Sequence, residues 1–90
     1  MRVALICKDK PGSLQIRLDN RPAHLEHIKS SGVVEMAGPF LTEAGEMCGS
    51  LVVLEVETLA QAQDWAARDP YALAGLFESV QITEWKKVIG

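Results

Sequence analysis

The order of strand-like and helix-like segments constrains the fold of this chain more than any other feature. Strand-like segments lie at residues 3–8, 33–37, 50–57 and 77–88. Segments with helix signals separate the first strand from the second and the third from the fourth, and a glycine-bearing loop joins the two middle strands as in a hairpin. The order β-α-β-β-α-β predicts an α+β, ferredoxin-like fold with a four-stranded antiparallel sheet. At 90 residues, we expect a single domain over residues 1–90.

Proline marks a boundary in both helical segments. At residues 21–24 (Arg-Pro-Ala-His), we expect the main first helix to begin with proline at its first position, where the missing N–H costs nothing. A brief helical turn at 14–18 precedes it. In the second segment, residues 58–61 match a capping box that starts a helix. Asp69-Pro70 then opens a separate short turn at 71–75.

The first and third strands are apolar on both faces. Residues 3–7 (Val-Ala-Leu-Ile-Cys) and 51–54 (Leu-Val-Val-Leu) contain no charged residue. In the predicted topology both helices cover the same face of the sheet, and the other face would expose more apolar area than a soluble monomer tolerates. We therefore expect a homodimer in which two sheets pack face to face as a dimeric α+β barrel.

Composition excludes several classes of function. The net charge of −3 provides no basic surface for nucleic acid. No apolar run approaches the roughly 18 residues of a membrane span, and about five apolar residues at the start are too few for a signal peptide. We therefore expect a cytoplasmic protein in which Cys7 and Cys48 are reduced. Neither cysteine has metal-ligand spacing, and we expect no metal and no cofactor.

His24 and Asp69 are the candidate acid–base residues, because a histidine and a carboxylate suffice for proton transfer near neutral pH. His24 lies roughly 70° from the centre of the apolar helix face that Leu25 and Ile28 define. In a first helical turn, the helix dipole would keep its ring neutral. Both residues have structural alternatives. His24 could simply bond to the backbone, and Asp69 could simply cap the turn that follows it.

Contact between His24 and Asp69 is not guaranteed by this topology. The start of the first helix and the end of the second lie at opposite ends of the sheet. The two side chains meet only if residues 69–76 fold back, if the turn at 14–18 shifts His24 along the helix, or if a dimer joins them. His27 lies about 130° from the apolar face and is expected in solvent, so His24 and His27 do not form a zinc site.

Three further residues are candidates for substrate binding. Arg21 precedes His24 by one turn and could hold a carboxylate or phenolate, although a surface arginine is the plain alternative. Tyr71 could hydrogen-bond a ligand or pack over the core. Ser50, at the start of the third strand, could contact substrate. It has no base at the spacing of a catalytic triad, which argues against a serine nucleophile.

The motifs at 21–24 and 68–71, together with Ala37-Gly38-Pro39 and the stretch 69–77, resemble the YciI-like (YCII-related) family. The resemblance covers essentially the whole chain, and the combination of motifs is more specific than any one of them. It implies a ferredoxin-like fold, a dimeric α+β barrel and a histidine–aspartate centre at His24 and Asp69.

A member of that family with an assigned activity is a dehydrochlorinase of chlorophenol breakdown, which removes HCl from a chlorinated hydroxyhydroquinone. The resemblance thus implies a cofactor-free lyase that acts on a small phenolic or cyclic substrate and yields a hydroxyquinone. In this interpretation His24, oriented by Asp69, removes a proton, while Arg21 and Tyr71 bind substrate oxygens. The alternative is a non-catalytic dimeric module that binds a small ligand or serves as an accessory subunit.

Overall fold

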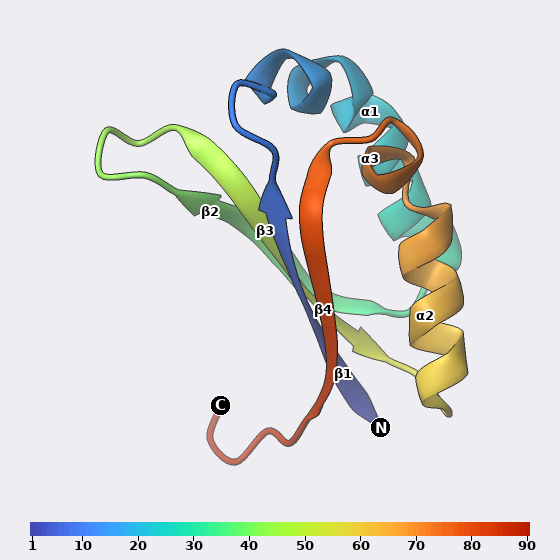
Figure 1. Ribbon diagram of the computed structural model, residues 1–90. Coiled ribbons are helices and arrows are strands. Elements are labelled where there is room, and N and C mark those ends of the chain that lie inside the picture. The colour runs from blue at the N-terminus through green and yellow to red at the C-terminus, as the bar shows by residue number, and fades with distance from the viewer.

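The computed structural model describes residues 1–90 and has one sheet covered on one side by helices (Figure 1). Its elements are β1 (Arg2–Asp9), α1 (Leu14–Ser31), β2 (Val34–Leu41), β3 (Met47–Glu55), α2 (Leu59–Arg68), α3 (Pro70–Leu73) and β4 (Phe77–Trp85). All strand pairs are antiparallel, in the order β2-β3-β1-β4. This confirms the predicted ferredoxin-like fold, with β1 and β3 at the centre of the sheet.

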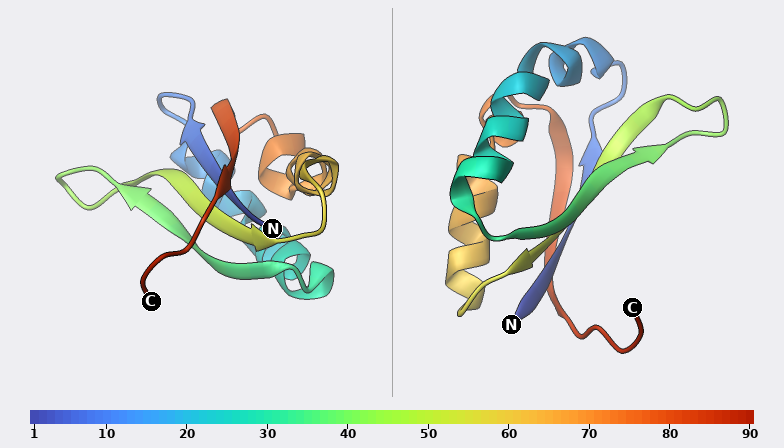
Figure 2. Two further views of the ribbon diagram at one scale, coloured as in Figure 1. Left: turned by 90° about the horizontal axis from the view of Figure 1, so that it is seen from below. Right: turned by 180° about the vertical axis from the view of Figure 1, so that it is seen from behind.

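The core lies between the central strands and the helices. Side chains alternate between the two faces of a strand, so Val3 and Leu5 of β1 point to the helices and are almost fully buried. Leu5 pairs across the sheet with Val52 of β3 and Ile82 of β4. Trp65 of α2 closes the other side of this core. Both views in Figure 2 show the helices gathered on the same side of the sheet.

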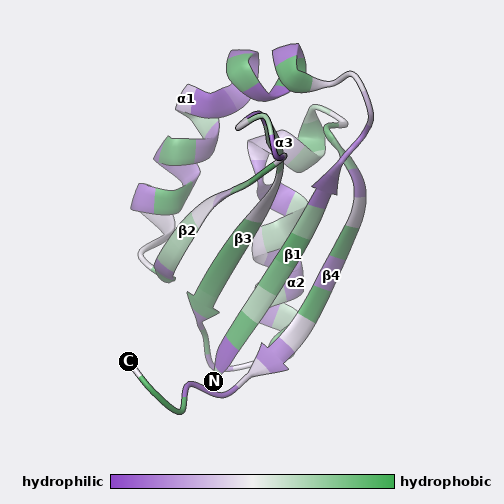
Figure 3. Cartoon of the chain, turned by 90° about the vertical axis from the view of Figure 1, so that its left-hand side faces the viewer, coloured by the Kyte–Doolittle hydropathy of each residue, from purple (hydrophilic) through white to green (hydrophobic).

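The opposite face of the sheet is covered by no element of the chain. Figure 3 looks onto this open face, where apolar residues follow the central strands. Four large apolar side chains there are between 40% and 46% exposed: Ile6, Met36, Phe40 and Trp85. The open face of the single chain therefore exposes apolar side chains, as the sequence predicted.

The first helix differs from the prediction. We expected it to begin at Arg21-Pro22, but α1 runs continuously from Leu14 to Ser31 with Pro22 inside it. A proline within a helix lacks the N–H for the bond to the preceding turn, and its ring pushes that turn aside, so the helix bends instead of ending. In Figures 1 and 2 the first turns of α1 lie across one end of the sheet and the remainder runs down its face. Gly32 ends the helix in the left-handed conformation, as predicted.

The second strand is also longer than predicted. Gly38-Pro39 does not end β2, which continues to Leu41. Proline lacks a donor for the sheet, but β2 is an edge strand and Pro39 lies opposite Ser50 without breaking the pairing. Gly38 and Pro39 are therefore part of the sheet and not of the loop that follows β2. Conversely, β4 ends at Trp85 and not at residue 88.

We expect alanine at Gly49 to destabilise the fold by about 1–3 kcal/mol, because the added Cβ would overlap the Cys7 carbonyl oxygen of β1. Gly38 provides a matched control in the neighbouring strand, since nothing lies within 4 Å of a Cβ added there. Gly38→Ala should change stability by no more than about 0.5 kcal/mol. Urea unfolding of both variants measures the difference, and equal losses would show that the contact with Cys7 is not the cause.

Candidate active site

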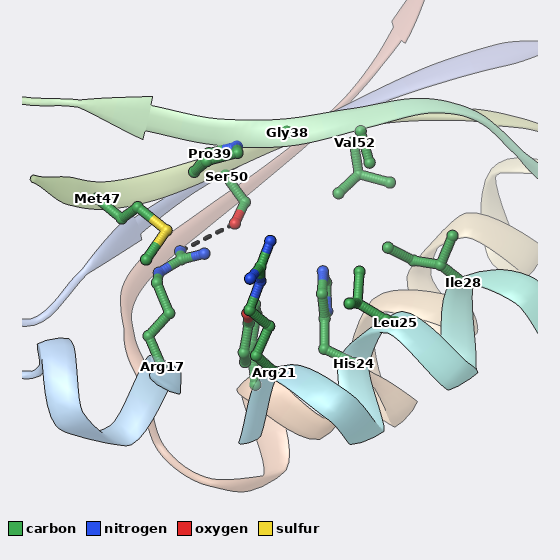
Figure 4. A pocket seen from close by; sticks show the side chains of 12 residues that line it. Arg17, Arg21, His24, Leu25, Ile28, Gly38, Pro39, Met47, Ser50 and Val52 are labelled. Carbon is green, nitrogen blue, oxygen red and sulfur yellow. Dashed lines mark hydrogen bonds between the residues drawn. The ribbon is translucent and has the colours of Figure 1, made fainter. Parts of the chain in front are cut away.

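A cavity of about 130 Å³ lies between α1 and the strands β2 and β3 (Figure 4). Tyr71 of α3 contributes to its lining from the helix side. The full lining is Arg17, Arg21, His24, Leu25, Ile28, Ala37, Gly38, Pro39, Met47, Ser50, Val52 and Tyr71. A cavity of roughly 150 Å³ can hold benzene, so this one has the scale of a single six-membered ring.

His24 and Asp69 are in direct contact. His24 Nδ1 lies 2.7 Å from Asp69 Oδ1, and the two residues are only 6% and 3% exposed. An ionised carboxylate only accepts hydrogen bonds, so Nδ1 carries the proton and the lone pair of the neutral ring is on Nε2. No bond within the chain uses Nε2, and His24 points from α1 toward the strands across the cavity (Figure 4). The free ring nitrogen can therefore accept a proton from a bound molecule.

Two of the three routes to this contact occur together. The turns of α1 before Pro22 place His24 ten residues after the first residue of the helix, Leu14, and not in its first turn. At the end of α2 the chain folds back into α3, which brings Asp69 against α1. A second protomer is not required. The dipole argument for a neutral His24 was wrong, because that effect is confined to the first turn of a helix.

Asp69 caps α3 and also contacts His24. The same oxygen, Oδ1, accepts the Tyr71 backbone N–H at 3.0 Å and so caps α3. Capping fixes the carboxylate relative to α3, and the fixed carboxylate fixes the His24 ring. The structural interpretation of Asp69 and the chemical one are therefore compatible.

Tyr71 packs against one face of the His24 ring. Its ring stacks on His24 with centroids 3.9 Å apart and an interplanar angle of 14°, and it meets Phe77 edge-on at 6.0 Å. Burial raises the pKa of Tyr71, although the positive charges of Arg17 and Arg21 oppose this shift. The phenol is therefore protonated at neutral pH. Tyr71 is buried, which confirms that it packs, and it also lines the cavity, so its hydrogen bond to a ligand stays a prediction.

A buried ion pair beside the cavity was missed from the sequence. Arg17 Nε and Nη2 donate to the two oxygens of Asp9, each at 2.8 Å, and Arg17 is only 2% exposed. The guanidinium also lies over the Tyr71 ring, 4.7 Å from its centroid. Burial alone would lower the pKa of Arg17, but the bonds to Asp9 outweigh it and the pKa is raised. The available signal was strand alternation, which places Asp9 on the same face as Val3 and Leu5.

The two remaining substrate-binding candidates, Ser50 and Arg21, differ in whether they already bond to other residues of the chain. Ser50 is buried, and its hydroxyl oxygen accepts a bond from Arg17 Nη2 at 2.9 Å. Arg21 is exposed at the cavity, where it forms no ion pair with an acidic side chain, and it points from α1 toward β2 (Figure 4). Arg21 thus keeps its donors available, whereas Ser50 also holds Arg17 in place.

His27 is not in solvent as we predicted. Its Nε2 donates to the Trp65 carbonyl oxygen at 3.1 Å, and its ring lies 4.4 Å from the indole. The helical-wheel argument considered α1 alone, whereas α2 packs beside it and covers His27. No group of three or more His, Cys, Asp or Glu side chains has an arrangement that could hold a metal ion.

Neither cysteine is a candidate nucleophile of this site. Both are free thiols, as expected. Burial raises the pKa of Cys7 to about 12, so this thiol stays protonated at neutral pH. Cys48 lies outside the cavity lining, where its sulfur is 3.5 Å from the Phe40 carbonyl oxygen.

The model of the YCII-related domain matches residues 1–86. The chain belongs to this family. Protein YciI of Escherichia coli O6:H1 is 38% identical to it over 98% of this chain and 99% of that protein. An uncharacterized protein of Haemophilus influenzae is 36% identical over the same shares. The YCII-related sequences therefore match the chain from end to end.

Solved structures add a family member with a described activity. The 5-chloro-2-hydroxyhydroquinone dehydrochlorinase TftG of Burkholderia phenoliruptrix, in complex with 2,5-dihydroxybenzoquinone, superposes with a TM-score of 0.87. It is 34% identical, and the match covers 96% of this chain and 94% of that one. An antibiotic biosynthesis monooxygenase, 12% identical with a TM-score of 0.56, shares the fold alone. In this YCII-related chain, no helix combines the length and apolar character needed to cross a bilayer.

Proposed function

We propose that this protein is a cofactor-free acid–base lyase that acts on a small phenolic ring, and that its reaction is the dehydrochlorination of a chlorinated hydroxyhydroquinone to a hydroxyquinone. The observation that carries the proposal is the buried His24–Asp69 pair, whose free ring nitrogen opens on a cavity of single-ring size. The likeness to TftG, which acts on such a compound, supports the choice of substrate.

The proposed chemistry needs one base and no oxidant. His24 Nε2 removes a proton from a substrate hydroxyl, and Asp69 stabilises the imidazolium that forms. The ring carbon that carries chlorine gains a proton, and chloride leaves with the electron pair of the C–Cl bond. The carbon takes up the proton that His24 removed from the first hydroxyl, and a second hydroxyl gives its proton to the freed base as chloride departs. Two hydroxyl oxygens thus become carbonyls, and the net loss is HCl. In this scheme Arg21 and Tyr71 bind the oxygens on which charge develops.

Chloride release from 5-chloro-2-hydroxyhydroquinone tests the reaction directly. A chloride electrode should record one chloride per substrate consumed, and absorbance should record the quinone at the same rate. Anaerobic solutions exclude oxidation of the substrate by air. A protein that binds the compound in calorimetry without releasing chloride would contradict the lyase and support the alternative, a binding or accessory module.

We further propose that the protein is a homodimer joined through the open face of the sheet, because Ile6, Met36, Phe40 and Trp85 are exposed there. Sedimentation at micromolar concentration should give twice the chain mass of 9.8 kDa. Ile6→Glu should produce monomers, whereas Leu59→Glu, at a position of similar exposure on α2, should not. A wild-type monomer of 9.8 kDa would contradict the proposal.

A further inference from the structure

Arg17 keeps one nitrogen free at the cavity. Its guanidinium carries N–H groups on Nε, Nη1 and Nη2. Nε and Nη2 are occupied by Asp9 and Ser50, at 2.8 to 2.9 Å. The Tyr71 side chain also interacts with the guanidinium and helps to raise its pKa, but no hydrogen bond within the chain is assigned to Nη1. Every fully buried side-chain nitrogen and oxygen of the protein has a partner, so Nη1 is not sealed in the core. In Figure 4 the guanidinium ends at the cavity beside Ser50.

The surroundings hold this nitrogen in a fixed position. Asp9 binds one edge of the guanidinium through both oxygens, and the guanidinium carbon lies over the Tyr71 ring. Ser50 accepts from Nη2, so its own hydroxyl hydrogen remains available to donate in the same region. An oxygen placed against Nη1 can thus receive bonds from Arg17 and from Ser50. Such fixed donors stabilise a negative charge without having to reorganise.

The cavity is polar at one end and apolar at the other. Arg17 and Ser50 lie at the polar end, Ile28 and Val52 at the apolar end, and His24 stands between them (Figure 4). A ring that places an oxygen at the polar end would lay its carbon edge against Ile28 and Val52. Its middle would then face His24, where proton removal is proposed.

We propose that Arg17 binds an ionised ring oxygen of the substrate through Nη1, with Asp9 and Ser50 as the residues that position it. The ligand class is a planar single ring that carries a phenolate or enolate oxygen. The inference rests on the proposed function and deepens it by assigning a specificity residue to the same cavity. It concerns binding of an anion and does not require that chloride be released.

Two ring compounds of similar size separate charge recognition from shape. Calorimetry at a pH that ionises the phenol should show that 4-nitrophenolate binds the protein at least tenfold more tightly than 4-nitroanisole, which cannot ionise. Arg17→Lys keeps the charge but loses the fork, and should reduce this preference about 10-fold or more, the usual size of a charge-assisted bond. Lys29→Met removes a positive charge from an exposed position of α1 and should leave the preference unchanged.

A second variant tests the inference in a protein that is expected to fold even if Arg17→Lys does not. The double substitution Asp9→Leu with Arg17→Met replaces the ion pair by apolar groups and should abolish the preference while circular dichroism stays native. Equal binding of the two compounds by the wild type, or a preference that survives in Arg17→Lys and in the folded double variant, would overturn the inference. An Arg17-dependent preference without chloride release would instead refute the proposed reaction and leave the anion site standing.

Discussion

His24→Ala is expected to lower kcat for chloride release by about 10²–10⁴-fold, the usual contribution of an acid–base group. The reason is that His24 Nε2 is the free proton acceptor at the cavity, held by the 2.7 Å contact of Nδ1 with Asp69. Alanine removes the base and also leaves the buried Asp69 without its partner. Initial rates and the urea midpoint should therefore both be measured.

His24→Asn separates these two effects. The amide nitrogen of asparagine can take the place of Nδ1 and donate to Asp69, but an amide is not a base. This variant should be as inactive as His24→Ala and closer to the wild type in stability. His27→Ala is the matched histidine control, because His27 bonds to Trp65 outside the cavity, and it should keep its activity. Full activity in His24→Ala would eliminate the proposed base.

Asp9→Ala is expected to destabilise the protein by about 3–5 kcal/mol, because it leaves the Arg17 cation buried without its partner. The Arg17 side chain is only 3% exposed, so solvent compensates little for the lost carboxylate. The double variant Asp9→Leu with Arg17→Met removes both charges together, leaves no unpaired ion in the core and should recover most of this loss. Urea unfolding at neutral pH gives both numbers.

The comparison that decides this prediction is between a surface pair and the buried one. Arg68 and Asp64 form an ion pair on α2 with side chains 74% and 63% exposed. Asp64→Ala should cost at most about 1 kcal/mol, as exposed pairs do. Similar losses of stability for Asp9→Ala and Asp64→Ala would show that burial does not increase the contribution of the Asp9–Arg17 pair to stability.

The sequence was sufficient for the order of elements, and it singled out two residues, His24 and Asp69, that the structure brings into contact. Strand-like runs, the capping box at 58–61 and the glycine at the end of the first helix depend on neighbours in sequence, and the structure has each of them. Thr58 accepts the Gln61 N–H at 3.2 Å, as the capping box requires, whereas the Gln61 side chain accepts the Glu57 N–H at 2.8 Å and not that of Thr58. Such local signals are decided within a few residues and can therefore be predicted from the sequence.

The errors have one common origin, which is packing between distant segments. Pro22 is a sound helix start in isolation, but α1 runs through it and is bonded to distant segments on both sides, by Arg17 to Ser50 and by His24 to Asp69. His27 lies on the polar side of its own helix, yet Trp65 is 38 residues away and covers it. Arg17 meets Ser50 across 33 residues, and no local pattern indicated that contact.

The single oxygen Asp69 Oδ1 serves both α3 and His24, and this has a consequence for how the protein could lose activity. If the short segment Pro70–Leu73 unwinds, the carboxylate is released and the imidazole is no longer held in one tautomer. Catalytic competence should then vanish on mild warming while the sheet is still intact. Local melting of four residues would thus inactivate the protein at a lower temperature than the one that unfolds it.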